Sequence, residues 1–86
     1  MYYAYLLKSE TIKKWYTGST NNLRKCLNEH NAGRSNWTKK GIPWKLIYYE
    51  ACLNEEDARS REKYLKTGMG KRYLKNRLKC FLSLTG

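Results

Sequence analysis

Long apolar runs are absent from the sequence, and its first residues carry neither the basic segment nor the small-residue cleavage site of a signal peptide. We therefore expect no membrane span and a cytoplasmic location. Acidic residues are also scarce, since 18 Lys and Arg stand against 7 Asp and Glu, a net charge of +11 over 86 residues. This excess favours an anionic partner and salt-sensitive association. Nucleic acid is the first candidate for this partner. A membrane surface is the second and weaker candidate, because the cations are spread along the chain and are not concentrated on one amphipathic helix.

Several motifs of well-known enzyme classes are missing as well. The sequence has no GxxxxGK(S/T) or GxGxxG loop to cradle a nucleotide and no GxSxG turn to present a nucleophilic serine. It has one histidine and three cysteines, Cys26, Cys52 and Cys80, without a CxxC pair. A Cys/His zinc site and a Cys–His hydrolase are therefore both disfavoured. We expect the cysteines to be reduced structural thiols, as in intracellular proteins.

The remaining pattern predicts a single α+β domain over residues 1–86. Leu23, Cys26, Leu27 and His30 recur at i, i+3, i+4 and i+7, which is typical of one face of a helix. The other expected elements are strands at 2–8, 15–19 and 44–50, a helix from the Asn54 cap to about 66, and a final helix past Gly70. Asn21 or Asn22 is expected to cap the first helix. This β-β-α-β-α-α order predicts a small three-stranded antiparallel β-sheet flanked by helices.

Glu62 occupies an unusual position for an acid. At ~100° per residue it shares a narrow arc of its helix with the apolar Leu65. An acid there needs an ion-pair partner, a bound cation or a place where the apolar stripe meets solvent. Arg59, Arg61 and Lys66 are the candidate partners. The alternative is a site for Mg²⁺, which one or two carboxylates and substrate phosphate oxygens commonly hold.

His30 presents a similar choice. It lies on the helix face of Leu23 and Leu27, where a histidine is often a packed residue with satisfied nitrogens. Its unperturbed pKa also suits proton transfer near neutral pH. The residues alone leave both interpretations open.

Five segments, taken together, resemble the GIY-YIG nuclease family. The paired tyrosine motifs that name the family are similar to residues 3–5, which end at Tyr5, and to residues 15–23, in which Tyr16 begins the second motif. Residues 29–33, 43–46 and 61–66 resemble the small single-domain members, which are similar to the N-terminal domain of the C component of excinuclease ABC and to structure-specific resolving endonucleases. The resemblance runs from about residue 2 to residue 72.

The resemblance implies a DNA endonuclease that hydrolyses a phosphodiester with one divalent ion, Mg²⁺ or Mn²⁺, in DNA repair or recombination. Tyr5 and Tyr16 would line the site on adjacent strands, one of them activating or orienting the attacking water. His30 would assist the proton transfer, and Glu62 would bind the metal ion. The implied partner is DNA, with branched or damaged DNA as candidates, and we expect the protein to be a monomer.

One position departs from the family pattern. The family carries an arginine ten residues after the second-motif tyrosine, and here that position is Cys26. Lys25 lies ~100° and Arg24 ~160° away around the helix, so neither points the same way. Loss of a transition-state charge donor typically costs ~10²–10³ in rate. We predict weak or absent cleavage with retained binding, and the alternative is a non-catalytic basic nucleic-acid-binding module; a small packed thiol or an engineered replacement would also account for the cysteine.

The DNA contacts are expected to be electrostatic. Trp37, in the loop that follows the first helix, could stack on a splayed base or pack onto its own domain. A preference for structured RNA over DNA would instead indicate an RNA- or ribosome-associated protein. The residues predicted to contact phosphates are Arg24, Lys25, Arg34, Lys39 and Lys40, with Lys66, Lys71 and Arg72 as a possible extension.

Overall fold

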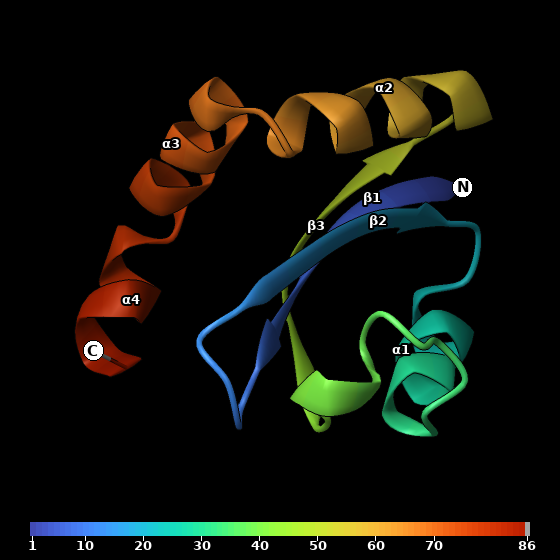
Figure 1. Ribbon diagram of the computed structural model, residues 1–86. Helices are drawn as coiled ribbons and strands as arrows, with labels where there is room; N and C mark the ends of the chain where they lie inside the picture. The colour runs from blue at the N-terminus through green and yellow to red at the C-terminus, as the bar shows by residue number, and fades with distance from the viewer. Residues whose placement is uncertain (86) are drawn as a thin grey trace.

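The computed structural model describes residues 1–85, and the side chains of residues 1–83. Its strands and helices follow the predicted β-β-α-β-α-α order, with the final helix divided in two (Figure 1). None of the helices in this part of the chain has both the length and the hydrophobicity to span a membrane. The elements are β1 (Tyr2–Ser9), β2 (Trp15–Thr20), α1 (Leu23–Asn31), the 3-10 helix η1 (Lys39–Gly41), β3 (Trp44–Cys52), α2 (Glu55–Leu65), α3 (Gly68–Arg77) and α4 (Lys79–Thr85).

The three strands form an antiparallel sheet in the order β2-β1-β3, which confirms the predicted architecture. On the central strand, Tyr5 lies opposite Gly18 of β2 and Tyr49 of β3. The register with β3 is irregular between Leu6 and Leu7. Because β1 is covered on both faces, its residues 4–7 are all buried and read as a continuous apolar run. On the outer strand β2, successive side chains point to opposite faces of the sheet, so this strand carries residues that belong to both faces.

The two faces of the sheet are covered by different helices. In Figure 1, α2 lies on one side of the sheet and α1 on the other. Ala4 and Leu6 point to the α2 side, where they pack against Leu65 of α2 and Leu74 of α3. The alternate residues of β1 point to the α1 side and form a second cluster that contains Tyr5, Leu7 and Trp44.

Local sequence signals fix where the helices begin. The side chain of Asn22 accepts a hydrogen bond from the backbone N–H of Lys25 and caps α1. Asn54 caps α2 in the same way, and acidic residues occupy its first turn. The hydroxyl of Thr67 caps α3, so this helix begins at Gly68, before the predicted start past Gly70.

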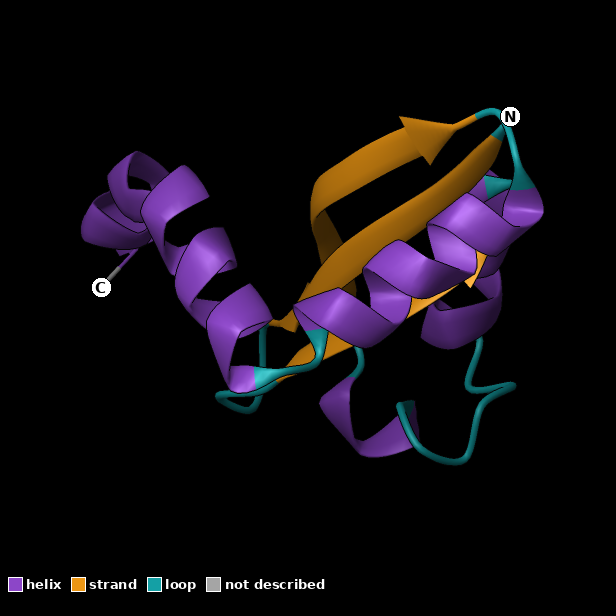
Figure 2. Cartoon of the chain, turned by 90° about the horizontal axis from the view of Figure 1, so that it is seen from above, coloured by secondary structure: helices purple, strands orange, loops and turns teal. Residues whose placement is uncertain are grey.

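The C-terminal region differs from the single predicted helix. The chain leaves helical geometry at Leu78, and α4 follows in a new direction (Figure 2). The division has a packing reason, because the apolar residues on the two sides of Leu78 have different neighbours. Leu74 packs into the core, whereas the ring of Phe81 lies beneath the ammonium groups of Lys8 and Lys45, at 5.6 and 5.7 Å from its centroid. A periodic pattern alone does not distinguish one helix from two.

Candidate active site

Tyr5, Tyr16 and His30 come from three different elements and meet on the α1 face of the sheet. The phenolic oxygen of Tyr5 lies 3.1 Å from Nε2 of His30, and the ring centroids of Tyr16 and His30 are 4.9 Å apart. The thiol of Cys26 donates to the Tyr5 oxygen across 3.0 Å. Four of the predicted catalytic positions thus form one cluster, with Tyr5 and His30 only 4% and 6% exposed.

The hydrogen bonds of this cluster run in one direction. Cys26 donates to the Tyr5 oxygen, so the Tyr5 hydroxyl is free to donate to Nε2 of His30. At the other ring nitrogen, Nδ1 of His30 lies 2.8 Å from Oγ1 of Thr38, whose own hydroxyl donates to the carbonyl of Ser35. Both ends require the same neutral imidazole, with its proton on Nδ1 and an acceptor lone pair on Nε2.

Gly18 makes room for the phenol of Tyr5. It lies opposite Tyr5 on β2, and a Cβ atom at this position would come within 2.5 Å of the Tyr5 oxygen. The aromatic side chain therefore lies across bare backbone of the outer strand. This close approach explains why the second motif needs glycine two residues after Tyr16.

Glu62 approaches the same outer strand from the opposite face of the sheet. Its Oε1 accepts a 2.7 Å hydrogen bond from Ser19 on β2, and its Oε2 lies 2.7 Å from Nζ of Lys66. Ser19 pairs with Ala4, so it points to the α2 side, away from the tyrosine cluster. Lys66, one of the candidate partners predicted from the sequence, therefore forms an ion pair with Glu62. The pair is open to solvent, since 23% of the glutamate side chain and 53% of the lysine side chain are exposed.

Burial and neighbouring groups set the protonation states of the site. Burial first, and then the adjacent Cys26 thiol, raise the pKa of the Tyr5 phenol far above its usual range, and nearby negative charge including Glu62 adds to this. Burial lowers the pKa of His30. Burial alone would raise the pKa of Glu62, but the hydrogen bonds that its carboxylate accepts outweigh this and hold it below its usual value. At neutral pH the site holds a protonated phenol, a neutral imidazole and an ionised carboxylate.

Glu62 also fits the requirements of a divalent metal ion. Residues 1–85 contain no group of three or more His, Cys, Asp or Glu that could enclose one. Mg²⁺ does not need such a cage, because it keeps several waters and takes substrate phosphate oxygens as ligands. The ionised carboxylate would provide one protein ligand if the exposed Lys66 exchanged its carboxylate contact for a phosphate.

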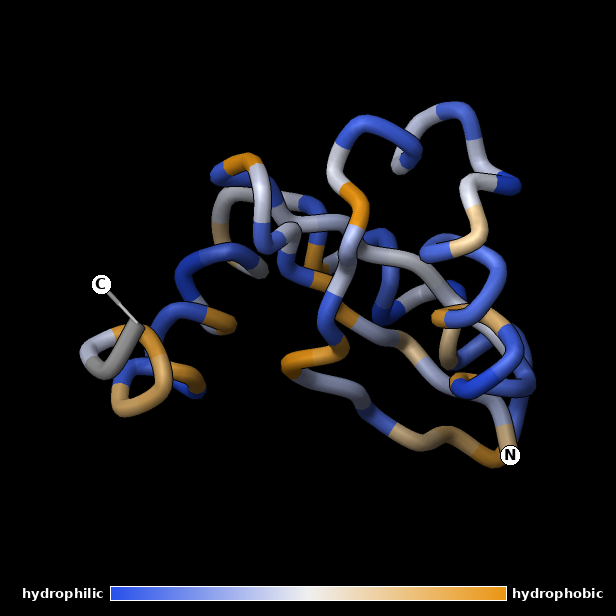
Figure 3. Tube along the Cα trace, turned by 90° about the horizontal axis from the view of Figure 1, so that it is seen from below, coloured by the Kyte–Doolittle hydropathy of each residue, from blue (hydrophilic) through white to orange (hydrophobic). Residues whose placement is uncertain are grey.

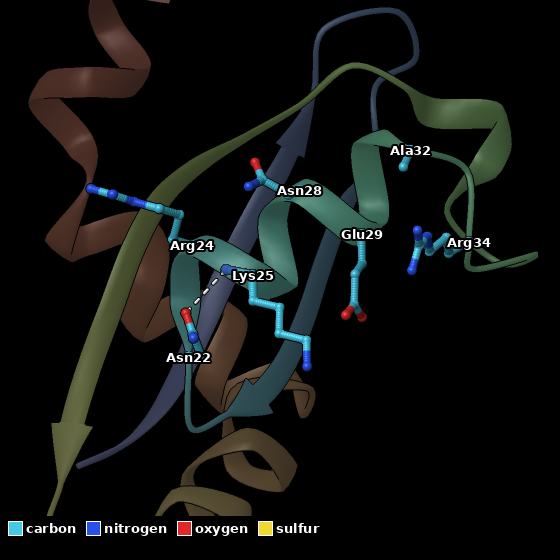
Figure 4. Close-up of a pocket in the computed structure, with 7 residues that line it drawn as sticks. All are labelled: Asn22, Arg24, Lys25, Asn28, Glu29, Ala32 and Arg34. Atoms are coloured by element: carbon cyan, nitrogen blue, oxygen red, sulfur yellow. Dashed lines mark hydrogen bonds between the residues drawn. The ribbon is translucent and has the colours of Figure 1, made fainter.

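The basic residues predicted on and after α1 are all exposed, and three of them share a hollow. Arg24, Lys25 and Arg34 line a space of about 440 Å³ beside α1, together with Glu29 (Figure 4). None of the aromatic residues of the cluster lines this hollow. The remaining two predicted cations, Lys39 and Lys40, are exposed on η1.

A second hollow with basic residues lies beside Tyr16. Lys66 and Lys71 line a space of about 250 Å³ that also contains Tyr16. The sequence predicts both lysines only as an extension of the basic surface. This hollow joins Tyr16 to the lysine that pairs with Glu62, but Tyr5, His30 and Glu62 themselves do not line it.

Two contributors to the site, Thr38 and Ser19, were missed from the sequence. Thr38 is 1% exposed and fixes His30, yet it lies in a polar loop with no periodic pattern. Ser19 holds Glu62, and its membership of the second motif segment was a usable signal. The role of Thr38 is visible only in the tertiary contacts.

Comparison with known proteins identifies the family. The model of the GIY-YIG catalytic domain matches residues 1–79. A UPF0213 protein of Clostridium perfringens is 43% identical over 67 residues, which are 77% of this chain and 71% of the relative. A UPF0213 protein of Streptococcus pyogenes serotype M3 is 40% identical over 65 residues, 73% and 71% of the two chains. No solved structure gives a significant match. The chain belongs to the GIY-YIG family, whose catalytic domain is a nuclease domain.

Proposed function

We propose that this protein is a metal-dependent DNA endonuclease whose activity is impaired at Cys26. The observation that carries the proposal is the hydrogen-bonded pair of Tyr5 and His30, set beside Tyr16 and a basic hollow that reaches the lysine partner of Glu62. Phosphodiester hydrolysis can use a proton acceptor for the attacking water and a carboxylate that holds a metal ion, and the chain offers these groups on the two faces of β2.

The proposed reaction divides the chemistry among these residues. Tyr5 is too weak an acid to act as a free phenolate, because burial raises its pKa. It can instead take a proton from the attacking water while it passes its own to Nε2 of His30, which is already in contact. Tyr16 orients the water from the neighbouring strand. A divalent ion, Mg²⁺ or Mn²⁺, bound at Glu62 would stabilise the charge on the phosphate and the leaving oxygen.

Cys26 is the reason for proposing impaired activity. Its thiol occupies the family arginine position and donates a hydrogen bond to Tyr5, but it brings no positive charge. An arginine there would offer a permanent cation with a planar fork that can bind two phosphate oxygens. The neighbouring Lys25 and Arg24 line the separate hollow beside α1 and do not replace it.

A nicking assay on supercoiled and branched DNA, with Mg²⁺ or Mn²⁺, tests the proposal. We expect Cys26→Arg to raise the cleavage rate by ~10²–10³ over wild type. Asn28→Arg is the matched control, because it adds the same charge on the same helix but in the hollow beside α1, and it should leave the rate at saturating DNA unchanged. If Cys26→Arg is folded and as inert as wild type, the enzyme proposal fails. Glu62→Gln in the active background should abolish the gain.

The second candidate is a non-catalytic DNA-binding module, which the neutral thiol of Cys26 favours. It predicts an affinity for DNA that falls steeply with salt and does not change in Glu62→Ala. The two candidates are separated by cleavage in Cys26→Arg. The endonuclease should gain activity in this variant, whereas the binding module should remain inactive, and both should bind DNA.

The biological setting is proposed on the same basis. We propose a role in DNA repair or recombination, with branched or damaged DNA as substrate and the monomer as the acting species. The cytoplasm is the proposed location, where the free thiols of Cys26, Cys52 and Cys80 would remain reduced.

A further inference from the structure

Trp37 is the most exposed aromatic side chain among the large hydrophobic residues of residues 1–83, with 92% of its surface in contact with solvent. The sequence left open whether this indole packs onto its own domain, and the structure excludes that packing. The segment that joins α1 to β3, which contains Trp37, projects from the body of the protein and is largely hydrophilic (Figures 2 and 3). A large apolar ring held in water at such a place is typical of a binding residue.

The backbone at Trp37 is nevertheless firmly anchored. The next residue, Thr38, is 1% exposed, and its Oγ1 lies 2.8 Å from Nδ1 of His30. The carbonyl of Thr38 accepts a 2.6 Å hydrogen bond from Nε1 of Trp44. The indole of Trp37 is therefore presented one residue away from a group that contacts the imidazole of the candidate active site. This anchoring reduces the conformational entropy that binding would cost.

The exposed cations that flank Trp37 in sequence favour an anionic ligand. The chain carries no acidic residue between Glu29 and Glu50, whereas Arg34, Lys39 and Lys40 flank the indole in sequence and are exposed. A purely apolar partner would have no use for these cations. An exposed aromatic ring among cations is the arrangement by which proteins bind single-stranded nucleic acid, since the ring stacks on a base and the cations contact the phosphates.

We propose that Trp37 stacks on an unpaired base of the DNA, so that the protein prefers DNA with a single-stranded segment to uninterrupted duplex. In a duplex the base faces are covered by their neighbours, and the indole has nothing to stack on. Where a tail, flap or junction exposes a base, Trp37 stacks on it while the exposed Arg34, Lys39 and Lys40 contact the phosphates. The inference rests on the proposed function for the identity of the ligand, but it concerns binding and does not require cleavage.

The test measures binding of the full chain to labelled DNA by fluorescence anisotropy in EDTA, so that no cleavage occurs. The probes are a blunt duplex and the same duplex with a single-stranded tail. We expect Trp37→Ala to weaken binding of the tailed probe by about tenfold, the magnitude typical of one base–aromatic stack, and to change duplex binding little. Trp37→Phe should retain part of the preference.

Met69→Ala is the matched control, because Met69 is 72% exposed but lies on α3. It should change neither affinity. Since both side chains are in solvent, the variants should keep the wild-type circular dichroism spectrum. The tailed probe should also quench more indole fluorescence in wild type than in Trp37→Phe, because Trp44 is buried and Trp15 is half-buried.

Three outcomes would overturn the inference, and they are distinguishable from one another. Equal losses on both probes would make Trp37 a general contact without preference for unpaired bases. Unchanged binding of both probes by Trp37→Ala would remove it from the DNA interface, while the proposed endonuclease would survive. Failure of wild type to bind either probe, or much tighter binding of structured RNA, would overturn the proposed function as well.

Discussion

Neighbouring residues of β1 lead to two regions with different chemistry. Leu6 points to the α2 side, where it packs against Leu65 and Leu74 in a cluster built from hydrocarbon. Tyr5 points to the α1 side, where buried oxygen and nitrogen atoms and the half-buried sulfur of Cys26 are joined by hydrogen bonds. Among the described residues no buried side-chain nitrogen or oxygen lacks a partner. One face supplies stability through burial of hydrocarbon, while the other holds buried polar groups at low cost because they are hydrogen-bonded.

Leu6→Ala should cause the largest loss of stability among these variants. The side chain is fully buried, so its truncation leaves a cavity in the α2 face and should lower the free energy of unfolding by about 2–5 kcal/mol. Tyr5→Phe, on the other face, should cost only about 1–3 kcal/mol, because it keeps the ring and removes the hydroxyl that His30 and Cys26 contact. Urea denaturation of both variants measures the difference. An equal cost would contradict the division between the faces.

Thr38→Val should have a smaller effect that is confined to the α1 face. It removes the acceptor of Nδ1 of His30 without changing the volume of the side chain, and should destabilise the fold by about 1–3 kcal/mol. His30 is the only histidine in the chain, so nitrogen NMR of the imidazole reports its tautomer without ambiguity. We expect the Nδ1-protonated form in wild type and a mixture in the variant. Thr17→Val on β2 is the control, and an unchanged tautomer in Thr38→Val would refute the role of the hydroxyl.

Acidification should destabilise the fold first through His30 on the α1 face, at a higher pH than that at which the carboxylates are protonated. Burial lowers the pKa of His30 below its ordinary 6.5, so the unfolded chain binds this proton at a higher pH than the folded protein does. The free energy of unfolding should therefore fall as the pH drops below about 6.5, by at most about 1.4 kcal/mol per pH unit. Glu50 and Glu62 also have lowered pKa values, but their stabilisation is lost only at more acidic pH, as they are protonated.

The measurement is urea denaturation of wild type and His30→Gln at a series of pH values between 7.5 and 5, a range chosen around the ordinary histidine pKa of about 6.5. The variant should show a flatter dependence, because it has no imidazole to protonate. A slope that is the same in both proteins would assign the effect to other groups.

Cys26→Ser should give the smallest change. A serine hydroxyl can donate to the Tyr5 oxygen as the thiol does, so the free energy of unfolding should change by less than about 1 kcal/mol. Cys26→Ala removes the donor and should cost more than Cys26→Ser. Thermal denaturation of the two variants decides the matter, and equal stability would mean that the thiol serves only as packing.

Much of the fold was predictable because its signals are local. Asn54 and the acids after it start α2 where the sequence indicated, and the spacing of Leu23 and Leu27 marks the buried face of α1. The division of the last helix at Leu78 was not predictable, because it depends on which distant residues receive Leu74 and Phe81. Periodicity indicates which face of a helix is buried, but it does not indicate which residues that face packs against.

The site was predicted in part for the same reason. Tyr5, Tyr16 and His30 could be named from motif and spacing, and they meet in the fold. The alternatives for Glu62 could not be separated from the sequence, because Lys66 lies one helical turn away whether or not a metal ion also binds. Thr38 escaped notice because a threonine in a loop acquires its role only when the loop folds back on α1.

The bare backbone at Gly18 links the two tyrosine motifs mechanically. The phenol of Tyr5 rests where a side chain would otherwise stand, so even a methyl group at position 18 would push the oxygen away from both of its partners. A substitution at position 18 of the second motif would therefore change the geometry of Tyr5 in the first motif. In the proposed endonuclease, a replacement at position 26 would therefore act on a tyrosine arrangement that is already in place, whereas loss of this glycine would disturb that arrangement itself.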